Sequence, residues 1–394
     1  MNKISKNVQI DYIYKFLSSF DITSAIWVLY LAFNGMSLIE IGLLEGIFHI
    51  TGLISEVPTG AIADLIGRKK AIVFSRSFSL ISAILMLFSA SFLGFAISFI
   101  FSALGYNLQS GSEEALVYDS LKILNREDEY LRINGRLNLI IEVSSALAVF
   151  VGGFLSKNNF KLSYIVAVII SLCALLVSIN FKEAKIVEKI NKEKSKIDVK
   201  NHFKECVRIL KSNKRILNYL TFFSSIYAFS ATIYFYNQQY LSDNGYSRLA
   251  ISIILLINGL IASLGSVFSS KIYNRYRSKA IALIPVLLST FIVIIGYSKG
   301  NFILLNLWII NLFTAILQPI SSNLINSMIE SEQRATILSL ESMFYSLSMI
   351  ILFPISGYIG DLFSLEISFR ILGLFSLILS FIQFSIIKKE CKNN

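Results

Sequence analysis

The chain of 394 residues is strongly apolar: 55% of its residues are hydrophobic, 15% are charged, and the mean hydropathy is +0.65. Soluble globular domains carry about 25% charged residues, so this composition excludes an ordinary soluble protein. The net charge of +11 would suggest nucleic acid as the partner of a soluble chain. A membrane protein instead collects basic residues in loops on one side of the bilayer, so we expect membrane lipid around this chain and no nucleic-acid partner.

Charged, Gly, Asn and Ser residues divide the sequence into apolar stretches of about 20 residues, the length that one transmembrane helix needs. These stretches predict twelve spans, at residues 12–33, 39–63, 71–92, 94–119, 134–156, 162–181, 215–241, 249–273, 280–298, 302–328, 335–360 and 367–387. Basic residues concentrate in alternate loops, among them the Arg68–Lys70 run and the segment from Lys182 to Lys214. The positive-inside rule then places both termini in the cytoplasm.

The composition changes abruptly after the sixth span, where a charged stretch is followed by an amphipathic pattern at Val199–Leu210 that predicts a helix on the membrane surface. We therefore expect an N-terminal six-helix bundle at residues 1–182, a cytoplasmic linker at 183–212 and a C-terminal six-helix bundle at 213–394. Sliding the halves by 209 residues aligns basic turns at Gly60–Ile72 and Ser269–Ile281, each between the second and third spans of its half. The predicted fold is an all-α membrane protein with twelve transmembrane helices in two pseudo-symmetric six-helix bundles.

The turn after the second span carries the pattern G-x-x-x-D-x-x-G-R-[KR], formed by Gly60, Asp64, Gly67 and Arg68 with Lys69. Gly60 allows close helix packing, Gly67 permits a tight reversal, and Asp64 can accept hydrogen bonds from a helix N-terminus or pair with an arginine. The pattern resembles the signature of the major facilitator superfamily, where this loop is a cytoplasmic latch. The resemblance implies that Gly60, Asp64, Gly67 and Arg68 form such a latch. Because tyrosines replace Asp64 and Gly67 in the second half, we expect only one working latch.

Within that family, residues 56–70 and 110–119 are most similar to the drug and tetracycline exporters of Gram-positive bacteria. The resemblance implies a multi-pass protein of the bacterial plasma (inner) membrane. Proton-antiporting exporters usually carry a G-P-x-x-G-G element late in the fifth span, and the corresponding Ala148–Gly153 keeps only its last two glycines. The motif therefore favours export and does not establish it.

Acidic residues within the spans are candidates for proton coupling, because a charge at the bilayer centre costs about 3 kcal/mol on insertion scales. Glu45, His49 and Glu56 share one face of the second span, and Asp21 lies near the middle of the first. The full set of proton-coupling candidates is Asp21, Glu45, His49, Glu56, Glu113, Glu114 and Glu142. The alternative is that some of these acids form structural ion pairs with basic residues at the span ends, Arg76, Arg132 and Arg136.

The predicted spans of the second half hold few acids but many amides and tyrosines, so substrate contacts are expected there and coupling in the first half. The substrate-binding candidates are Tyr236, Asn237, Gln238, Asn258, Asn311 and Gln318. Aromatic residues in membrane proteins also form belts at the membrane interface, which is the alternative for each tyrosine.

The sequence contains no nucleophile–base pair, phosphate-binding loop or metal-spaced cluster, so we expect neither an enzyme nor a metal or cofactor site. We expect a secondary active transporter that works as a monomer and exports a small amphipathic or drug-like compound in exchange for protons or another coupling ion. One alternative is proton-coupled uptake of a small polar metabolite. Another is a membrane receptor or scaffold that keeps the fold without transport.

Overall fold

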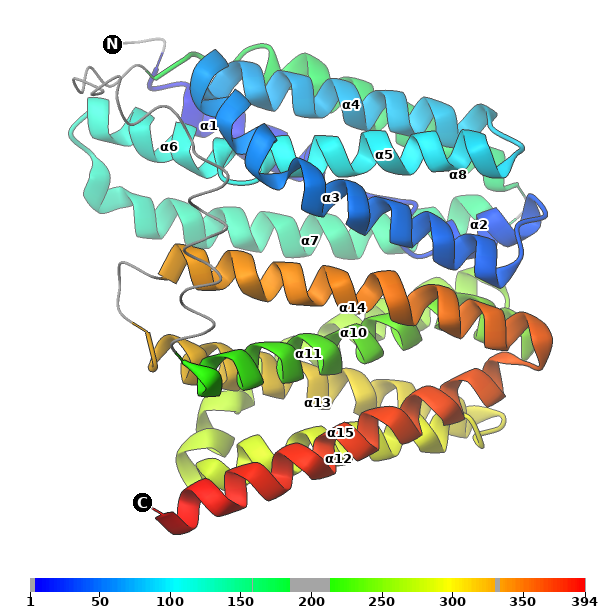
Figure 1. The fold of residues 1–394 in the computed structure, drawn as a ribbon. Coiled ribbons are helices and arrows are strands. Elements are labelled where there is room, and N and C mark those ends of the chain that lie inside the picture. Colours follow the sequence, from blue (N-terminus) through cyan, green and yellow to red (C-terminus); the bar gives the residue numbers. More distant parts are fainter. Residues whose placement is uncertain (1–3, 158, 185–212, 330–333, 394) are drawn as a thin grey trace. The chain divides into compact units, whose positions relative to one another are not determined.

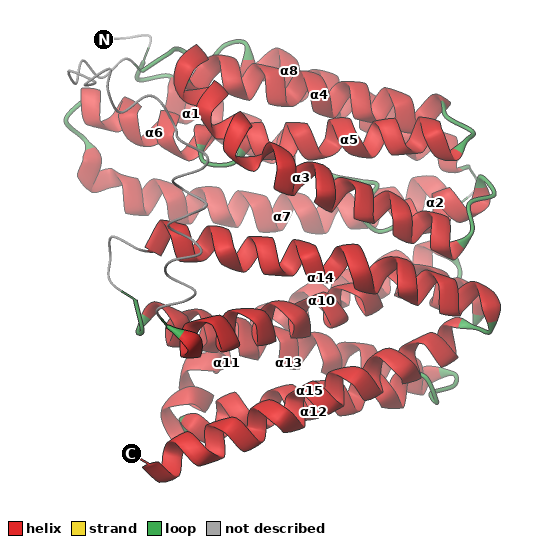
Figure 2. Ribbon diagram, in the orientation of Figure 1, coloured by secondary structure: helices red, strands yellow, loops and turns green. Residues whose placement is uncertain are grey.

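A computed structural model describes residues 4–157, 159–184, 213–329 and 334–393, and the elements in these ranges follow one another as helices along the chain (Figure 1). Figure 2 shows that no strand occurs in this described part. Eleven helical segments within it are long and apolar enough to cross a membrane, at Leu38–Ala63, Arg68–Phe88, Phe92–Ile123, Glu127–Ser156, Phe160–Ser178, Lys214–Asp243, Arg248–Tyr276, Ser278–Ile295, Asn301–Asn326, Ile337–Leu362 and Leu365–Lys388. They lie close to the second to twelfth predicted spans, because hydropathy and bilayer thickness together determine where such a helix begins and ends.

The first predicted span, residues 12–33, is not one continuous helix. Helix α1 (Asn7–Ser19) ends before residues 20–26, and the short helix α2 (Trp27–Phe33) follows them. Asp21 lies in this break, where its Oδ1 accepts hydrogen bonds from Thr23 N at 2.9 Å and Thr23 Oγ1 at 2.6 Å. This local turn competes with the helix, as short Asp side chains commonly do. The expectation that Asp21 lies within a regular helix is therefore wrong.

Helix α7 (Tyr130–Ser156) covers the break and satisfies backbone groups that the end of α1 leaves free. Ser144 Oγ donates to Phe16 O at 2.6 Å, and Ser145 Oγ donates to Ser19 O at 3.4 Å. Further along α7, a Cβ atom built on Gly152 would lie 1.8 Å from Ile22 O, so the two backbones touch at this glycine. Non-helical backbone among membrane helices is tolerated where neighbouring protein meets its polar groups in this way.

The chain forms two compact units. The first comprises Met1–Trp27 and Ile47–Val199. In it α1 packs against α7 and α8 (Phe160–Ser178), and α4 (Arg68–Phe88) packs against α5 (Phe92–Gln109), α6 (Ser112–Ile123) and α8. A short 3-10 helix, η1 (Glu127–Glu129), precedes α7. Tyr14, Ile72, Leu116 and Phe181 form a buried apolar cluster in this unit.

The second unit comprises Val28–Gly46 and Lys200–Asn394, so helix α3 (Leu38–Ile66) begins in the second unit and continues in the first. Its helices are α2, α10 (Lys214–Asp243), α11 (Arg248–Tyr276), α12 (Ser278–Ile295), α13 (Asn301–Asn326), α14 (Arg334–Leu362) and α15 (Leu365–Asn393). Helix α10 packs against α14, α11 against α13, and α12 against α15. The predicted surface helix at 199–210 lies outside the described residues, and the predicted boundaries at 182 and 213 stay predictions.

Substituting Gly152 by alanine is expected to destabilise the protein, because the new Cβ would overlap the Ile22 carbonyl oxygen. Overpacking of this kind costs about 1 to 3 kcal/mol and should lower the melting temperature of the purified protein in detergent. Gly135→Ala on the same helix is the matched control, since a Cβ there meets no atom within 4 Å and should leave stability unchanged or slightly raised. Equal melting temperatures for the two variants would contradict the close contact between α7 and the break.

Candidate functional site

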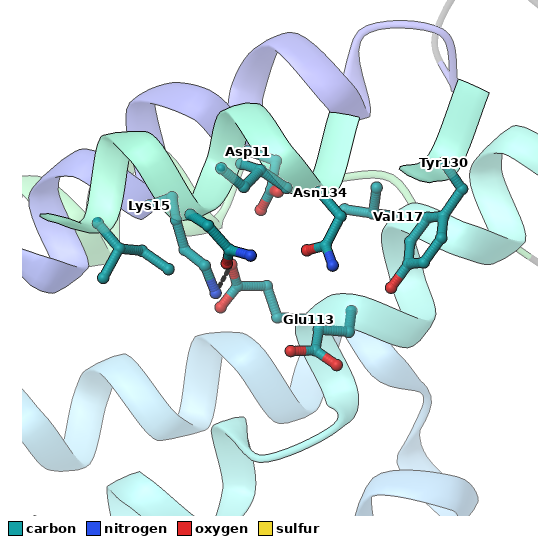
Figure 3. Close-up of a pocket in the computed structure, with 10 residues that line it drawn as sticks. Asp11, Lys15, Glu113, Val117, Tyr130 and Asn134 are labelled. Atoms are coloured by element: carbon teal, nitrogen blue, oxygen red, sulfur yellow. Dashed lines mark ion pairs between the residues drawn. The ribbon is translucent and has the colours of Figure 1, made fainter. Parts of the chain in front are cut away.

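A cluster of charged side chains lies in the first unit, where α1, α6 and α7 meet; Asp11 and Glu113 are buried, Lys15 is half-buried and Glu114 is exposed. Asp11 and Lys15 are four residues apart on α1 and share one face of that helix, while Glu113 and Glu114 lie in the first turn of α6. Figure 3 shows Asp11, Lys15 and Glu113 around a common pocket, with Tyr130 at its side. We call the residues Asp11, Lys15, Glu113 and Glu114 the acidic cluster.

Glu113 is held by partners from two directions. Its Oε1 lies 2.7 Å from Lys15 Nζ, which forms an ion pair whose two side chains are 4% and 15% exposed for Glu113 and Lys15. Its Oε2 accepts a hydrogen bond of 2.8 Å from Gln109 Nε2, and Gln109 in turn accepts one from the Arg76 guanidinium. Arg76 also lies over the ring of Tyr14, 5.7 Å from its centroid. The chain of contacts from Arg76 to Lys15 therefore holds the Glu113 side chain in place.

Asp11 differs from Glu113 because it is buried without such partners. Its side chain is 1% exposed, and neither carboxyl oxygen has a hydrogen-bond donor among the described residues. Of its charged neighbours, Glu113 acts on it most strongly and Lys15 next. Asp11 therefore lies beside an acid that is already paired with Lys15, and it has no donor of its own among the described residues.

The cavity beside these acids has a volume of about 30 Å³ and is lined by polar groups that include Tyr130, Asn134 and Asn138. That volume accommodates one or two water molecules and excludes a drug-sized ligand. The acidic cluster is therefore suited to holding a proton or water and not to holding the transported compound.

The structure places the sequence-predicted coupling residues in different surroundings. Glu113 and Glu114 line the cavity of the acidic cluster. Asp21, Glu56 and Glu142 are exposed, Glu45 is half-buried, and His49 is buried. On α3, Glu45 belongs to the second unit while His49 and Glu56 belong to the first. Coupling roles for Asp21, Glu45, His49, Glu56 and Glu142 stay predictions, and only Glu113 and Glu114 are brought together.

Sequence analysis did not select Asp11 or Lys15 as site residues. Asp11 lies just before the expected start of the first span at residue 12, and Lys15 lies just after it. The i, i+4 spacing of an acid and a base at the edge of an apolar stretch was the available signal. It places both side chains on one helix face, which in a membrane protein must turn inward. Partners such as Gln109 could be found only from the packing of α4, α5 and α6.

The predicted substrate residues of the second unit divide into those with structural partners and those without. Tyr236 OH donates to Leu38 O at 2.7 Å, and Gln238 Oε1 accepts from Val28 N at 3.2 Å. Asn311 Nδ2 donates to Leu307 O of its own helix at 3.0 Å, and Gln318 is exposed. The remaining two, Asn237 and Asn258, are 0% and 2% exposed, and neither amide group has a hydrogen-bond partner among the described residues.

The predicted latch is built around a carboxylate that sequence analysis did not select. Glu183 accepts hydrogen bonds from Arg68 N at 2.9 Å and Lys69 N at 3.0 Å, which caps the N-terminus of α4. Gly67 precedes this helix with φ of +95°, and a Cβ there would lie 2.9 Å from the Glu183 carboxyl carbon. Glycine is thus required for both the backbone angle and the approach of Glu183. A Cβ at Gly60 would meet nothing within 4 Å, and the Asp64 side chain lies outside the described part.

These features define a polytopic helical membrane protein with an internal charged site. The sequence model of the Major Facilitator Superfamily matches residues 13–310 and 220–390, and the chain belongs to this family. It is therefore a transporter of small molecules and not an enzyme.

Two curated relatives span nearly the same length. An uncharacterised MFS-type transporter of Bacillus subtilis (strain 168), YxaM, is 25% identical over 379 residues, which cover 95% of this chain and 93% of the relative. An uncharacterised MFS-type transporter of Methanocaldococcus jannaschii is 23% identical over 397 aligned positions, which cover 98% and 99% of the two chains. These matches agree with a multi-pass membrane transporter.

Among solved structures, the nucleoside transporter NupG matches with a TM-score of 0.74 at 15% identity, covering 99% of this chain and 100% of that one. A D-xylose–proton symporter and a peptide transporter POT also match over nearly their whole length, both with a TM-score of 0.72. Such different cargoes on one fold mean that the fold does not select the substrate.

The Lys15–Glu113 pair predicts a non-additive effect of substitution. Lys15→Met leaves the buried Glu113 carboxylate without its ammonium partner, so it should lower stability by about 3 to 5 kcal/mol. Glu113→Gln should also lower stability, but by less, because the half-buried Lys15 can pair with Asp11 instead. The double variant removes both charges and should recover much of that loss. Melting temperatures of the four proteins in detergent, arranged as a double-mutant cycle, measure the coupling. Glu129→Gln, which breaks an exposed pair with Arg126, is the control and should leave the melting temperature unchanged. Additive losses would contradict a buried ion pair.

Proposed function

We propose that this transporter couples proton movement to the export of a small amphipathic or drug-like compound, and that the acidic cluster carries the proton. The observation that supports this proposal most directly is Asp11, a carboxyl group with 1% exposure and no hydrogen-bond partner among the described residues. A buried ionised carboxylate without a partner is costly, so the neutral acid is the favoured form in this arrangement. Access of water to the cavity would restore the ionised form and release the proton.

Lys15 also takes part in the proposed proton step, because it can pair with either acid. While Asp11 is neutral, Lys15 pairs with Glu113 at 2.7 Å. Once Asp11 is ionised, it competes with Glu113 for the same ammonium group, which lies one helical turn away on α1. Proton release from Asp11 therefore changes which contacts join α1 to α6, and such a change is what couples a proton to a conformational step.

The compound itself is proposed to bind in the second unit, where Asn237 and Asn258 are buried amides without partners among the described residues. Buried polar groups in proteins are normally hydrogen-bonded, so these two amides are suited to a ligand that carries carbonyl, hydroxyl or amide groups. Amide side chains favour a neutral or weakly polar ligand. The proposed proton site lies elsewhere, in the first unit.

We further propose that α1 and α2 together form one crossing, which brings the total to twelve. α1 has 13 residues and α2 has 7, too few for either to span about 30 Å of hydrocarbon alone. An even number of crossings places both termini on the same side, which the positive-inside rule assigns to the cytoplasm of the cell membrane. The protein is proposed to act as a monomer.

The coupling proposal predicts that Asp11→Asn loses substrate-driven proton movement by at least about tenfold while it retains substrate exchange, because a neutral amide cannot carry the proton. The assay is a pH-sensitive dye in proteoliposomes, with ethidium, tetracycline, uridine, D-xylose and a dipeptide as probes. Exchange of labelled probe without a gradient serves as the measure of intact folding and binding. Asp128→Asn is the matched control, because Asp128 is exposed in η1 and is not among the coupling candidates. Full coupling in Asp11→Asn would refute the assignment.

Direction is tested with the same probes in inverted and right-side-out membrane vesicles under an imposed proton gradient. Export predicts accumulation in inverted vesicles that are acid inside. Accumulation in right-side-out vesicles that are acid outside would instead support uptake. Absence of movement for every class of probe, with folded protein present, would favour a receptor or scaffold.

A further inference from the structure

The N-terminus of α3 is capped by a residue from a helix more than 300 positions away in sequence. The carboxylate of Asp361, near the end of α14, accepts hydrogen bonds from Leu38 N at 2.9 Å and from Ile39 N at 2.8 Å. These are the first two N–H groups of α3, which have no partner within the helix itself. All of these residues belong to the second compact unit.

This distant contact is additional to a complete local cap. Ser37 Oγ accepts from Glu40 N at 3.3 Å, while Glu40 Oε2 accepts from Ser37 N at 2.8 Å, which together form a capping box. The start of α3 is therefore stabilised by its own sequence, and Asp361 is not needed to define the end of the helix. What Asp361 adds is attachment of α3 to α14.

The backbone beside this cap lies unusually close to α10 and α14. Tyr236 OH on α10 donates to Leu38 O at 2.7 Å and also reaches Phe353 O at 3.2 Å. A Cβ at Gly357 would lie 2.2 Å from Leu38 O, and one at Gly42 would lie 2.7 Å from Pro354 Cα. Glycines at both positions thus permit the approach that brings Asp361 onto the helix end.

The preceding short helix α2 is attached to the same unit by similar polar contacts. Gln238 Oε1 accepts from Val28 N at 3.2 Å, and the Arg248 guanidinium lies 5.8 Å from the ring centroid of Phe33. Residues 28–46 therefore belong with α10, α11 and α14, although α3 continues after Gly46 into the first unit. The segment also buries apolar side chains such as Leu31 and Ile41, whereas Asp361 and Phe33 are solvent-exposed.

We propose that Asp361 and Tyr236 form a gating clamp, which holds the start of α3 on α10 and α14 and is released and remade in each transport cycle. An alternating-access carrier must open its two ends in turn, so each end needs contacts that water can replace at small cost. An exposed carboxylate on helix N–H groups meets that requirement, because water can solvate both partners once they separate. Tyr236 and Gln238 then serve to position this segment and do not bind the transported compound.

The clamp is tested by measuring how fast a cysteine on the first turn of α3 reacts with a reagent in water. Ile41 is 0% exposed on the first turn of α3, so Ile41→Cys is introduced after Cys173, Cys206 and Cys391 have been replaced by serine. The purified protein in lipid nanodiscs is then labelled with a membrane-impermeant maleimide. Asp361→Ala, which removes both acceptor oxygens, should raise the labelling rate about fivefold, the factor expected for loss of one helix cap. Tyr236→Phe should raise it in the same direction.

Glu40→Gln provides the matched control, because it weakens the local cap of the same helix without touching α14. It should leave the labelling of Ile41→Cys close to the parent rate. Ser289→Cys, fully buried between α12 and α15, reports general loosening and should stay protected in every variant. The clamp would be overturned by an unchanged rate in Asp361→Ala, by an equal rise in Glu40→Gln, or by a rise at both reporter cysteines. The experiment needs neither a substrate nor a proton gradient, so its outcome is separate from the coupling assignment.

Discussion

Hydrocarbon offers no hydrogen bonds, so each polar group placed among these helices has to be met by another part of the protein. The break between α1 and α2 shows the consequence most directly. Ser144 and Ser145 on α7 donate to carbonyl groups at the end of α1, and Gly152 lets the backbone of α7 reach Ile22. The interruption of the first span is possible because α7 is built to accommodate it.

The same constraint separates the two acids of the cluster. Glu113 has an ammonium group and an amide as partners, which compensate for its burial, whereas Asp11 has no hydrogen-bond partner among the described residues. The two carboxyl groups in one small polar cavity thus differ in the partners that their surroundings supply. That difference is the basis of the proton step proposed for Asp11.

A second recurring device is the carboxylate that caps a helix from a distant segment. Glu183 caps α4 in the first unit, and Asp361 caps α3 in the second. In each case the acid binds two successive backbone N–H groups, the arrangement that the partial positive charge of a helix N-terminus favours. Gly67 is needed where Glu183 approaches, and Gly357 lies beside the contact of Asp361. Such bonds attach a helix end to a segment that lies far away in the sequence.

The sequence alone determined the class of this protein. Hydropathy located the second to twelfth spans closely, because each crossing needs about 20 mainly apolar residues in one continuous stretch of the chain. The motif from Gly60 to Lys69 indicated the family, since glycine and charge at fixed spacing describe one turn. Glu113 and Glu114 were selected because acids within apolar stretches are rare.

Only the tertiary structure decided which polar residues have partners. Asp11 and Lys15 became part of a site because α1 packs on α6 and α7, and Tyr236 was found on the Leu38 carbonyl oxygen although its sequence context favoured substrate binding. The break at residues 20–26 depends on serines and a glycine more than 120 positions later in the chain. Hydrogen bonds and ion pairs depend on distances between helices, and those distances follow from packing that no local pattern of residues contains.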